Sequence, residues 1–329
     1  MAIGTIITTL REDPEALKMY GGNISEVERK LAGIHIERIS VEELETINRK
    51  SEISRVLAHL PAEAIIRHFG QDILLWTWLM YPERGKIKDQ LRRGVEEITG
   101  VDMELLERAQ IFEMLVSRED AYHHIMVNYN LLQAQRNGNI GKENLEKILF
   151  NARKRGDERV NEQTVKKYSI TITEPCVKRN HGWDINWKKR RFGNKMYEIY
   201  LDAAFGFLLL YNDEPSAVCT FDTTSKKTAL IKQFQGTTPK IVDGNKTKGN
   251  AWALAPFDWT RFFVDYTSAW LQQFGFEDIG IQAGQKNRWI HKRGSHQLPI
   301  EMAEARYDGT AQRLGFRQHD DGNWYRRIA

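Results

Sequence analysis

The sequence of 329 residues is poor in cysteine and has no long apolar run. Its two cysteines, Cys176 and Cys219, lie outside any metal-ligand or redox spacing. This argues against a disulfide framework and favours a reducing compartment. The longest apolar run, from Ala203 to Tyr211, is far shorter than the ~20 residues that a membrane-spanning helix needs. No membrane passage is therefore expected.

Several common functional motifs are also missing. The sequence contains no nucleophile elbow, P-loop, dinucleotide fingerprint or zinc spacing, so no metal site is expected. The N-terminus, MAIGTIITTLRED, has no charged leader before its short apolar patch. The protein is therefore expected to remain in the cytoplasm, and a place in a virus particle is compatible with that. The net charge of +4 permits an acidic partner without requiring one.

The length favours two domains, and the first half of the chain has helical patterns. A helix is predicted over 41–60, with Ser40 as its N-cap, and a second over 61–80, beginning at Pro61. A third ends at Gly100. The region 102–135 is predicted to hold two helices, or one bent near Val116, and 141–156 one more.

Periodicity changes from helical to strand-like after a polar stretch over 153–167. Short strands are predicted at 169–175, 197–203, 205–211, 216–222 and 228–235, as an antiparallel meander. A helix from Trp259, a strand at 278–284 and a helix over 299–315 follow. Asp321-Gly322 is typical of a tight two-residue hairpin turn.

These patterns predict an α+β protein. An all-α N-terminal domain (1–155) is followed by a basic and aromatic linker with a first strand (156–196) and by an α/β domain (197–329) with a mixed, mostly antiparallel sheet.

From Tyr197 to Ile328 the order of elements and some local words resemble the GNAT superfamily of acyl-CoA N-acyltransferases. WTRFFVDYTSAWLQQFGFEDIGIQAGQKN resembles the central helix and fifth strand of that family, with a strand that ends near Asn287. YDGTAQRLGF resembles its final helix, which leads into a Gly-Phe pair. The resemblance implies a GNAT-like fold and acetyl-CoA, or another acyl-CoA, as cofactor.

The resemblance also implies a pyrophosphate cradle between the fourth strand and the N-terminus of the central helix. Gln233, Gly236, Thr237 and Thr238 match its Gln-x-x-Gly beginning, although Pro239 follows and the helix begins nearly twenty residues later. Lys248-Gly249-Asn250-Ala251 is a second candidate, closer to the helix. The cofactor-binding candidates are therefore Gln233, Gly236, Thr237, Thr238, Gly249, Asn250 and Asn287. A surface loop without a ligand is the alternative.

The family often has a tyrosine four residues before the Gly-Phe pair, which protonates the leaving thiolate. Ala311 has that place here, and Tyr307 lies one turn earlier on the same helix face. Tyr307 is the candidate general acid, or else one of a core-facing stripe with Ala311 and Leu314. Asp202 and Asp222, like Glu198, either supply a base or face solvent.

The segment 177–195 is rich in lysine and arginine, interleaved with aromatic residues. Cations that neutralise phosphates beside rings that stack on bases predict a single-stranded nucleic-acid surface. The alternative is a solvated charge run held by packed tryptophans. The candidates for contact with nucleic acid or an acidic partner are Arg179, Trp183, Trp187, Lys188, Lys189, Arg190 and Arg191.

The histidines give weaker signals. His123 and His124 lack an i+4 partner that would make a metal pair, which favours a structural role. His291 and His296 lie in a loop with Arg288, Lys292 and Arg293 that could cover a cleft or contact an acidic partner.

Two functions fit the sequence. In the first, a degenerate GNAT-like domain serves as a structural or interaction module that binds a protein assembly or nucleic acid, as in a virus-encoded or host-defence protein. In the second, it is an active N-acyltransferase whose amine acceptor is selected by the helical domain. Fold alone does not decide between them.

Overall fold

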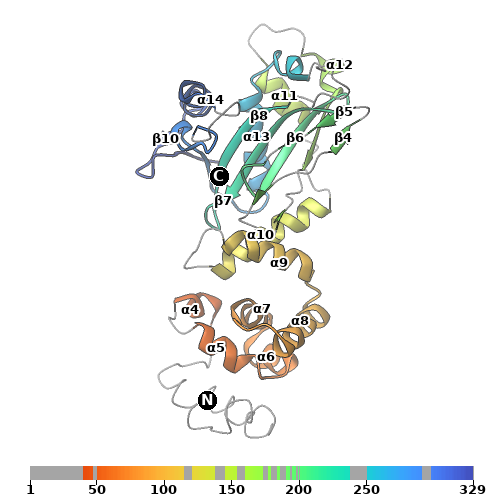
Figure 1. Ribbon diagram of the computed structural model, residues 1–329, viewed down its shortest axis with the longest axis vertical. Coiled ribbons are helices and arrows are strands. Elements are labelled where there is room, and N and C mark those ends of the chain that lie inside the picture. Colours follow the sequence, from red (N-terminus) through yellow and green to blue (C-terminus); the bar gives the residue numbers. More distant parts are fainter. Residues whose placement is uncertain are drawn as a thin grey trace. The chain divides into compact units, whose positions relative to one another are not determined.

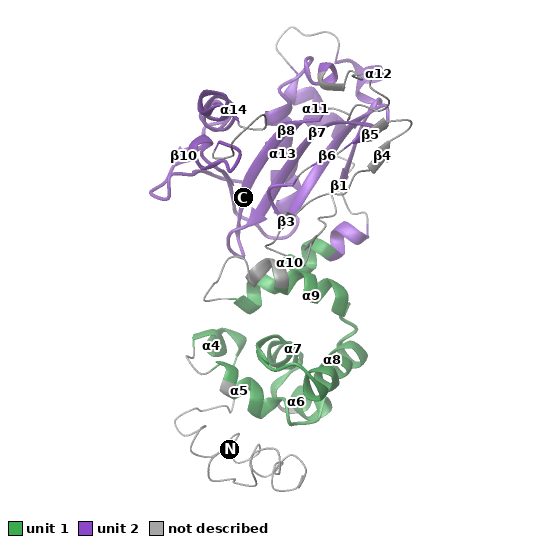
Figure 2. Cartoon of the chain, viewed as in Figure 1, with its two compact units in different colours: residues 1–132 green, residues 133–329 purple. Residues whose placement is uncertain are grey.

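The computed structural model in Figure 1 divides into two compact units, residues 1–132 and 133–329, referred to below as the helical unit and the sheet unit (Figure 2). It describes residues 40–46, 50–114, 121–137, 145–153, 160–172, 177–178, 184–185, 190–192, 195–197, 199, 201–237, 250–290 and 298–328. The class expected from the sequence, helices first and then a mixed, mostly antiparallel sheet, is confirmed.

The helical unit is built around one helix that is buried on almost every side. Its helices are α4 (Val41–Thr46), α5 (Lys50–Leu57), α6 (Ala62–Phe69), α7 (Gln71–Met80), α8 (Lys86–Thr99), α9 (Met103–Met114) and α10 (Ala121–Arg136), the last of which crosses the boundary between the units. α7 contacts α4, α5, α6 and α8, and its residues from Ile73 to Leu79 are buried. The indole of Trp76 donates to the Glu45 carboxylate at 2.8 Å, so a polar bond joins α7 to α4 inside the core.

Glycines set the ends of these helices. The single helix predicted over 61–80 is wrong, because Gly70 has φ 92° and separates α6 from α7. Gly100, with φ 66°, ends α8 as predicted. Gly94 lies inside α8 where a Cβ would come within 2.6 Å of the Ala62 Cβ, so glycine allows α8 to approach α6 closely. Two helices, α9 and α10, occupy the region where two helices or one bent helix was expected.

The side chain of Lys88, a residue of α8, contacts the C-terminal end of α7. Its ammonium donates to the carbonyl oxygens of Trp78 and Tyr81, and lies 4.3 Å from the centroid of the Trp78 ring. Burial lowers the pKa of Lys88 from 10.5 to about 8, and the Glu107 carboxylate opposes this shift. The helical unit therefore holds a lysine whose proton is released more easily in the folded state.

We expect the stability of the helical unit to rise between about pH 8 and about pH 10. Here the unfolded chain, in which Lys88 has its ordinary pKa, binds more protons than the folded chain. At higher pH the raised pKa values of Tyr81 and Tyr122 reverse the trend. Urea denaturation followed by circular dichroism would measure this rise. Lys88→Met should abolish it and the exposed control Lys86→Met should keep it, while a rise that persists in Lys88→Met would contradict the assignment.

The sheet unit contains a seven-stranded sheet in the order β1-β6-β7-β8-β9-β11-β10, of which β6, β7, β8 and β10 are labelled in Figure 1. The strands are β1 (Tyr168–Ile172), β6 (Phe205–Tyr211), β7 (Glu214–Thr223), β8 (Thr228–Gly236), β9 (Asp278–Ile281), β10 (Arg317–Gln318) and β11 (Trp324–Arg327). All neighbours are antiparallel except β8 and β9. Two further ladders pair β2 (Val177–Lys178) with β3 (Asp184–Ile185), and β4 (Arg190–Phe192) with β5 (Lys195–Tyr197).

Of the five strands predicted as an antiparallel meander, β6, β7 and β8 form one. The first, β1, joins the sheet by pairing with β6. The strand predicted at 197–203 is wrong, because Tyr197 is the last residue of β5 and residues 201–204 lie outside any strand.

The first turn of the meander has the geometry of a tight hairpin. Asn212 and Asp213 have φ 48° and 62°, the left-handed values that match the twist of the flanking strands. The two-residue turn predicted at Asp321-Gly322 is wrong. Gln318 pairs with Trp324, and Gly322 has φ 78° in a longer loop whose ends are joined by the His319 N–H and the Asn323 carbonyl at 2.9 Å.

The helices of the sheet unit are α11 (Leu145–Ala152), α12 (Glu162–Val165), α13 (Trp259–Gln272) and α14 (Ile300–Arg313), with short 3-10 helices η2 (Asn250–Leu254) and η3 (Gly284–Lys286). α13 packs on one sheet face, with the Phe207 ring 5.1 Å from Tyr266 and 5.3 Å from Trp270. α14 contacts η3, β9 and β11. The apolar face predicted for the helix from Trp259 is buried, with Trp259 itself half-buried.

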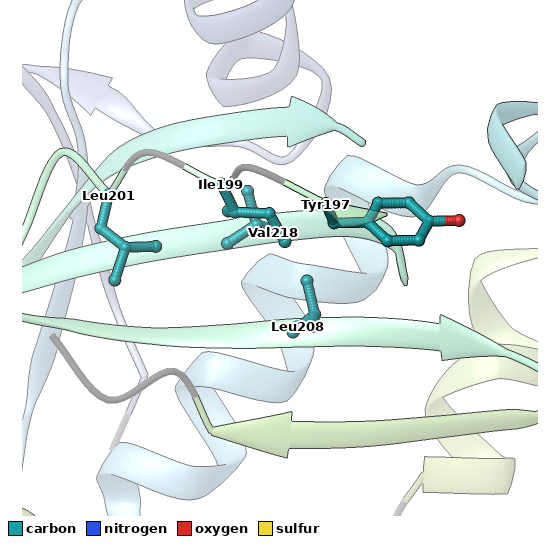
Figure 3. Packing of buried hydrophobic residues seen from close by; sticks show 5 residues of the cluster. All are labelled: Tyr197, Ile199, Leu201, Leu208 and Val218. Carbon is teal, nitrogen blue, oxygen red and sulfur yellow. The ribbon is translucent and has the colours of Figure 1, made fainter. Parts of the chain in front are cut away.

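Alternate residues of the segment before β6 pack against the strands in Figure 3. Tyr197, Ile199 and Leu201 form a buried cluster with Leu208 of β6 and Val218 of β7. Because Phe207 and Leu208 are successive residues of one strand, this cluster lies on the sheet face opposite α13.

The boundary between the units lies in α10, whereas the sequence placed it near residue 155. The difference comes from α11, which was expected in the helical domain but packs against α13. Arg153 makes a β-bridge with Phe257, and the Asp258 N–H donates to the Ala152 carbonyl at 2.6 Å. In the part of the chain that is described, no helix is long and apolar enough to cross a membrane.

Candidate functional site

The candidate site lies where β8 and β9 separate. The two strands pair from Thr228 and Asp278 to Ile231 and Ile281, and the Gln282 N–H donates to the Ile231 carbonyl at 2.9 Å. β8 then continues to Gly236 along β7, while the chain after β9 turns into η3. The main-chain groups of Phe234 therefore point into the space between the strands.

Side chains of α14 form hydrogen bonds with both the N–H and the carbonyl group of Phe234. The Phe234 N–H donates to the Tyr307 hydroxyl at 3.2 Å, and Arg306 donates to the Phe234 carbonyl at 3.4 Å. The edge of a strand is otherwise a template for an extended ligand or another strand. At Phe234, side chains of the protein itself occupy this edge.

Tyr307, the candidate general acid, is 2% exposed. Burial raises the pKa of its phenol, and the hydrogen bond from Phe234 opposes this shift. Its neighbour on the helix, Ala311, is also buried, while Leu314 is partly exposed. Tyr307 is therefore part of the core-facing stripe, and its hydroxyl satisfies a buried backbone donor. Its role as an acid stays a prediction.

A cluster of polar side chains joins β7, β8, the segment before β6 and the loop after η3. We call Asp202, Thr220, Gln233, Arg288 and Trp289 the polar cluster. The amide oxygen of Gln233 accepts from the Thr220 hydroxyl at 3.1 Å and from the Asp202 N–H at 3.2 Å. Both Gln233 and Thr220 are buried, so the Gln233 amide is tied to the fold.

The Asp202 carboxylate is the charged centre of the polar cluster. Its side chain is 4% exposed and lies 2.7 Å from Arg288 Nη2, whose own side chain is 40% exposed. The Trp289 indole N–H donates to both carboxylate oxygens, at 2.8 and 3.1 Å. Asn287, also buried, fixes this turn because its side-chain oxygen accepts from the Trp289 N–H at 3.0 Å. The carboxylate of Asp202 is thus neutralised internally and does not face solvent.

The Asp222 carboxylate is also bound by groups of the protein. One carboxylate oxygen accepts from the Ala204 N–H at 2.7 Å and the other lies 2.5 Å from Lys232 Nζ. Glu198 lies outside the described residues, as do His291, Lys292, Arg293 and His296. Among the described residues, no group of three or more His, Cys, Asp or Glu could hold a metal ion.

The expected phosphate cradle begins inside a paired strand. Gly236 pairs with Ala217, and the Thr237 N–H donates to the Ser216 carbonyl at 2.9 Å. The buried hydroxyls of Ser216 and Thr237 have no hydrogen-bond partner among the described residues. Thr238 and Gly249 lie outside the described residues, and Asn250 begins η2. Cofactor binding by these residues stays a prediction.

The N-terminus of α13 carries a carboxylate of the protein. Asp258 is the N-cap, and it accepts from the Arg261 N–H at 3.2 Å and from the Thr260 hydroxyl at 2.7 Å. Arg313 lies 3.2 Å from its second oxygen. Although burial alone would raise it, these hydrogen bonds and the arginine lower the pKa of Asp258, so the group remains an anion.

The sequence placed several residues of this site and missed others. Gln233 and Asn287 are linked through Asp202 and Trp289, and Tyr307 bonds to Phe234, the residue after Gln233. Arg306, Thr220 and Trp289 were missed, because a single arginine, threonine or tryptophan carries no signal of its partner. Of the basic segment, Arg190 and Arg191 lie in β4, and Arg179, Trp183, Trp187, Lys188 and Lys189 lie outside the described residues.

Comparison of the chain with protein-family models, with curated proteins and with solved structures finds no match. The charged groups of the site are paired internally, its strand edge is closed, and the N-terminus of its central helix holds a carboxylate.

Proposed function

We propose that the sheet unit has the fold of the GNAT acyltransferases and serves as a non-catalytic interaction module. The fold part of the proposal is supported by the order β6, β7, β8, α13, β9, α14, β10, β11 along the chain, which is the element order of the resemblance. It is also supported by the parallel pairing of β8 with β9 across α13, and by the insertion of β11 between β9 and β10.

The observation that carries the non-catalytic part is the Asp258 carboxylate at the N-terminus of α13. A pyrophosphate would need the free N–H groups and positive end of this helix. Asp258 already accepts from one of these groups, and its negative charge repels a phosphate. The contacts of Tyr307 and Arg306 with Phe234 are a second, independent support, because they occupy the strand edge that an extended thioester ligand would use.

Titration calorimetry of the full chain with acetyl-CoA tests this proposal. We expect no saturable heat up to about 1 mM ligand, which corresponds to a binding free energy weaker than about −4 kcal/mol. ADP serves as the control for general attraction of phosphates. A dissociation constant below about 100 μM for acetyl-CoA, absent for ADP and lost in Gly249→Val, would instead favour an active N-acyltransferase.

Tyr307→Phe separates the two roles of this tyrosine, because its effect on stability can be measured without any ligand. Loss of a hydroxyl that served only as a catalytic acid would leave thermal stability unchanged. A structural hydroxyl would lower stability by about 1 to 3 kcal/mol, because the Phe234 N–H would lose its buried acceptor. The proposal requires the second outcome.

A further inference from the structure

Trp252 is the most exposed of the large apolar side chains that stand out on the described surface, at 61%. It lies on η2, just before α13, and its ring meets the Tyr211 ring edge-on at 5.1 Å. Burying a tryptophan is strongly favourable, so an indole held outside the core at this exposure is available to a partner.

The indole rests on a rigid aromatic base. The Tyr211 ring lies 4.9 Å from Tyr168, whose ring lies 5.4 Å from Phe257. The Tyr168 hydroxyl donates at 2.7 Å to the carbonyl of Ala253, the residue next to Trp252. The backbone beneath the indole is therefore tied to the sheet, and little ordering cost remains for a ring that stacks on it.

Three exposed cations are neighbours of this base along the chain or across a β-bridge. Lys166 and Lys167 directly precede Tyr168, and the Lys167 carbonyl accepts from the N–H of the residue after Tyr211 at 2.8 Å. Arg153 forms a β-bridge with Phe257. None of the three has a carboxylate within ion-pair distance in the described part of the chain.

Two exposed carboxylates, Glu162 and Asp213, belong to the same region and limit its positive charge. An anionic partner would therefore bind this region with modest affinity, and more weakly as the salt concentration rises. We call Trp252, Arg153, Lys166 and Lys167 the Trp252 surface.

We propose that the Trp252 surface binds single-stranded nucleic acid, with a base stacked on the indole and phosphates beside the three cations. Stacking on a fixed aromatic ring next to cations is the combination that sequence-tolerant binding of single strands uses, and these three cations have no carboxylate partner among the described residues. The site uses none of the residues named around the space between β8 and β9, and it holds whether or not acyl-CoA binds. It also uses no residue of the basic segment 177–195.

Fluorescence anisotropy with labelled 15-residue oligothymidylate and oligouridylate, across a salt series, tests the site in the full chain. Trp252→Ala should weaken binding about tenfold, and Trp252→Phe less, because a base loses its stacking partner. Joint neutralisation of Arg153, Lys166 and Lys167 to glutamine should reduce the slope of log affinity against log salt by about 2. Lys226→Gln, an exposed lysine in the turn between β7 and β8, is the matched control and should change neither.

Three results would overturn the proposal. One is absence of binding at low salt. Another is binding that is lost when Lys188 to Arg191 are neutralised but is unchanged in Trp252→Ala and in the triple variant. The third is equal affinity for an acidic peptide of the same length, which would reduce the site to general attraction of anions or to a protein-docking surface. Thermal melting confirms that each variant is folded, and Trp252→Phe with the triple variant decides the question if Trp252→Ala is not.

Discussion

Replacing Gly284 with alanine is expected to lower the free energy of unfolding of the sheet unit by about 3 kcal/mol, the upper end of the usual cost of overpacking. A Cβ on Gly284 would lie 2.6 Å from the Glu304 nitrogen, 2.7 Å from its Cα and 2.8 Å from the Ala303 carbonyl carbon. These are backbone atoms of α14 and cannot move aside without shifting the helix. Urea denaturation followed by circular dichroism would measure the loss.

Gly309→Ala is the matched control, on α14 itself. There a Cβ would meet its nearest neighbours at 3.8 Å, an ordinary contact, and nothing in the structure requires glycine. Because glycine costs about 1 kcal/mol relative to alanine inside a helix, this variant should be neutral or more stable than the native chain. Equal destabilisation by the two substitutions would show that α14 is not held against Gly284 as described.

Replacing Asp202 with alanine is expected to lower the free energy of unfolding by about 2 to 3 kcal/mol. Removing one member of a buried ion pair usually costs more, but water reaches part of Arg288 and reduces the loss. The substitution also leaves the Trp289 indole N–H without the two carboxylate oxygens that accept it. Thermal and urea denaturation of the full chain would measure the effect.

Glu277→Gln tests whether the loss of stability expected for Asp202→Ala is due to the burial of that carboxylate. Glu277 pairs with Lys227 and Arg327 near the other end of β9, but in contact with solvent. The effect of this control should be much smaller, because exposed ion pairs contribute little to stability. Arg288→Met in the Asp202→Ala background should recover part of the loss, since it removes the charge left without a partner. A failure to recover, together with equal effects of Asp202→Ala and Glu277→Gln, would contradict the polar cluster.

Most of the sheet unit could be predicted from the sequence because its signals are local. Alternating apolar residues identify β6, β7 and β8. Gly275 and Gly315, both with positive φ, follow α13 and α14, as glycines that end helices do. The prediction failed where a single glycine could either remain in a helix or break it. Gly70 breaks one, whereas Gly94 and Gly309 lie inside helices.

The candidate site could be predicted only in part, because its contacts join residues far apart in the sequence. Asp202 meets Trp289 across 87 positions, and Phe234 meets Tyr307 across 73. Such pairs depend on which strands are neighbours, and no spacing of residues records that. Asp202 next to apolar residues was compatible with solvent contact until its arginine and tryptophan partners were known. The same limit applies to α11, whose helical pattern does not say against which unit it packs.

The parallel pairing of β8 with β9 has a consequence for the order in which the sheet unit folds. β6, β7 and β8 are joined by short turns, so their pairing closes small loops and carries a low entropic cost. Thr228 and Asp278 pair only after the intervening chain and α13 have been ordered, which makes this a non-local and slower step. We therefore expect the meander to form early and the junction of β8 with β9 to form late. A chain that is released while still partly folded would have the three strands of the meander and none of the site between β8 and β9.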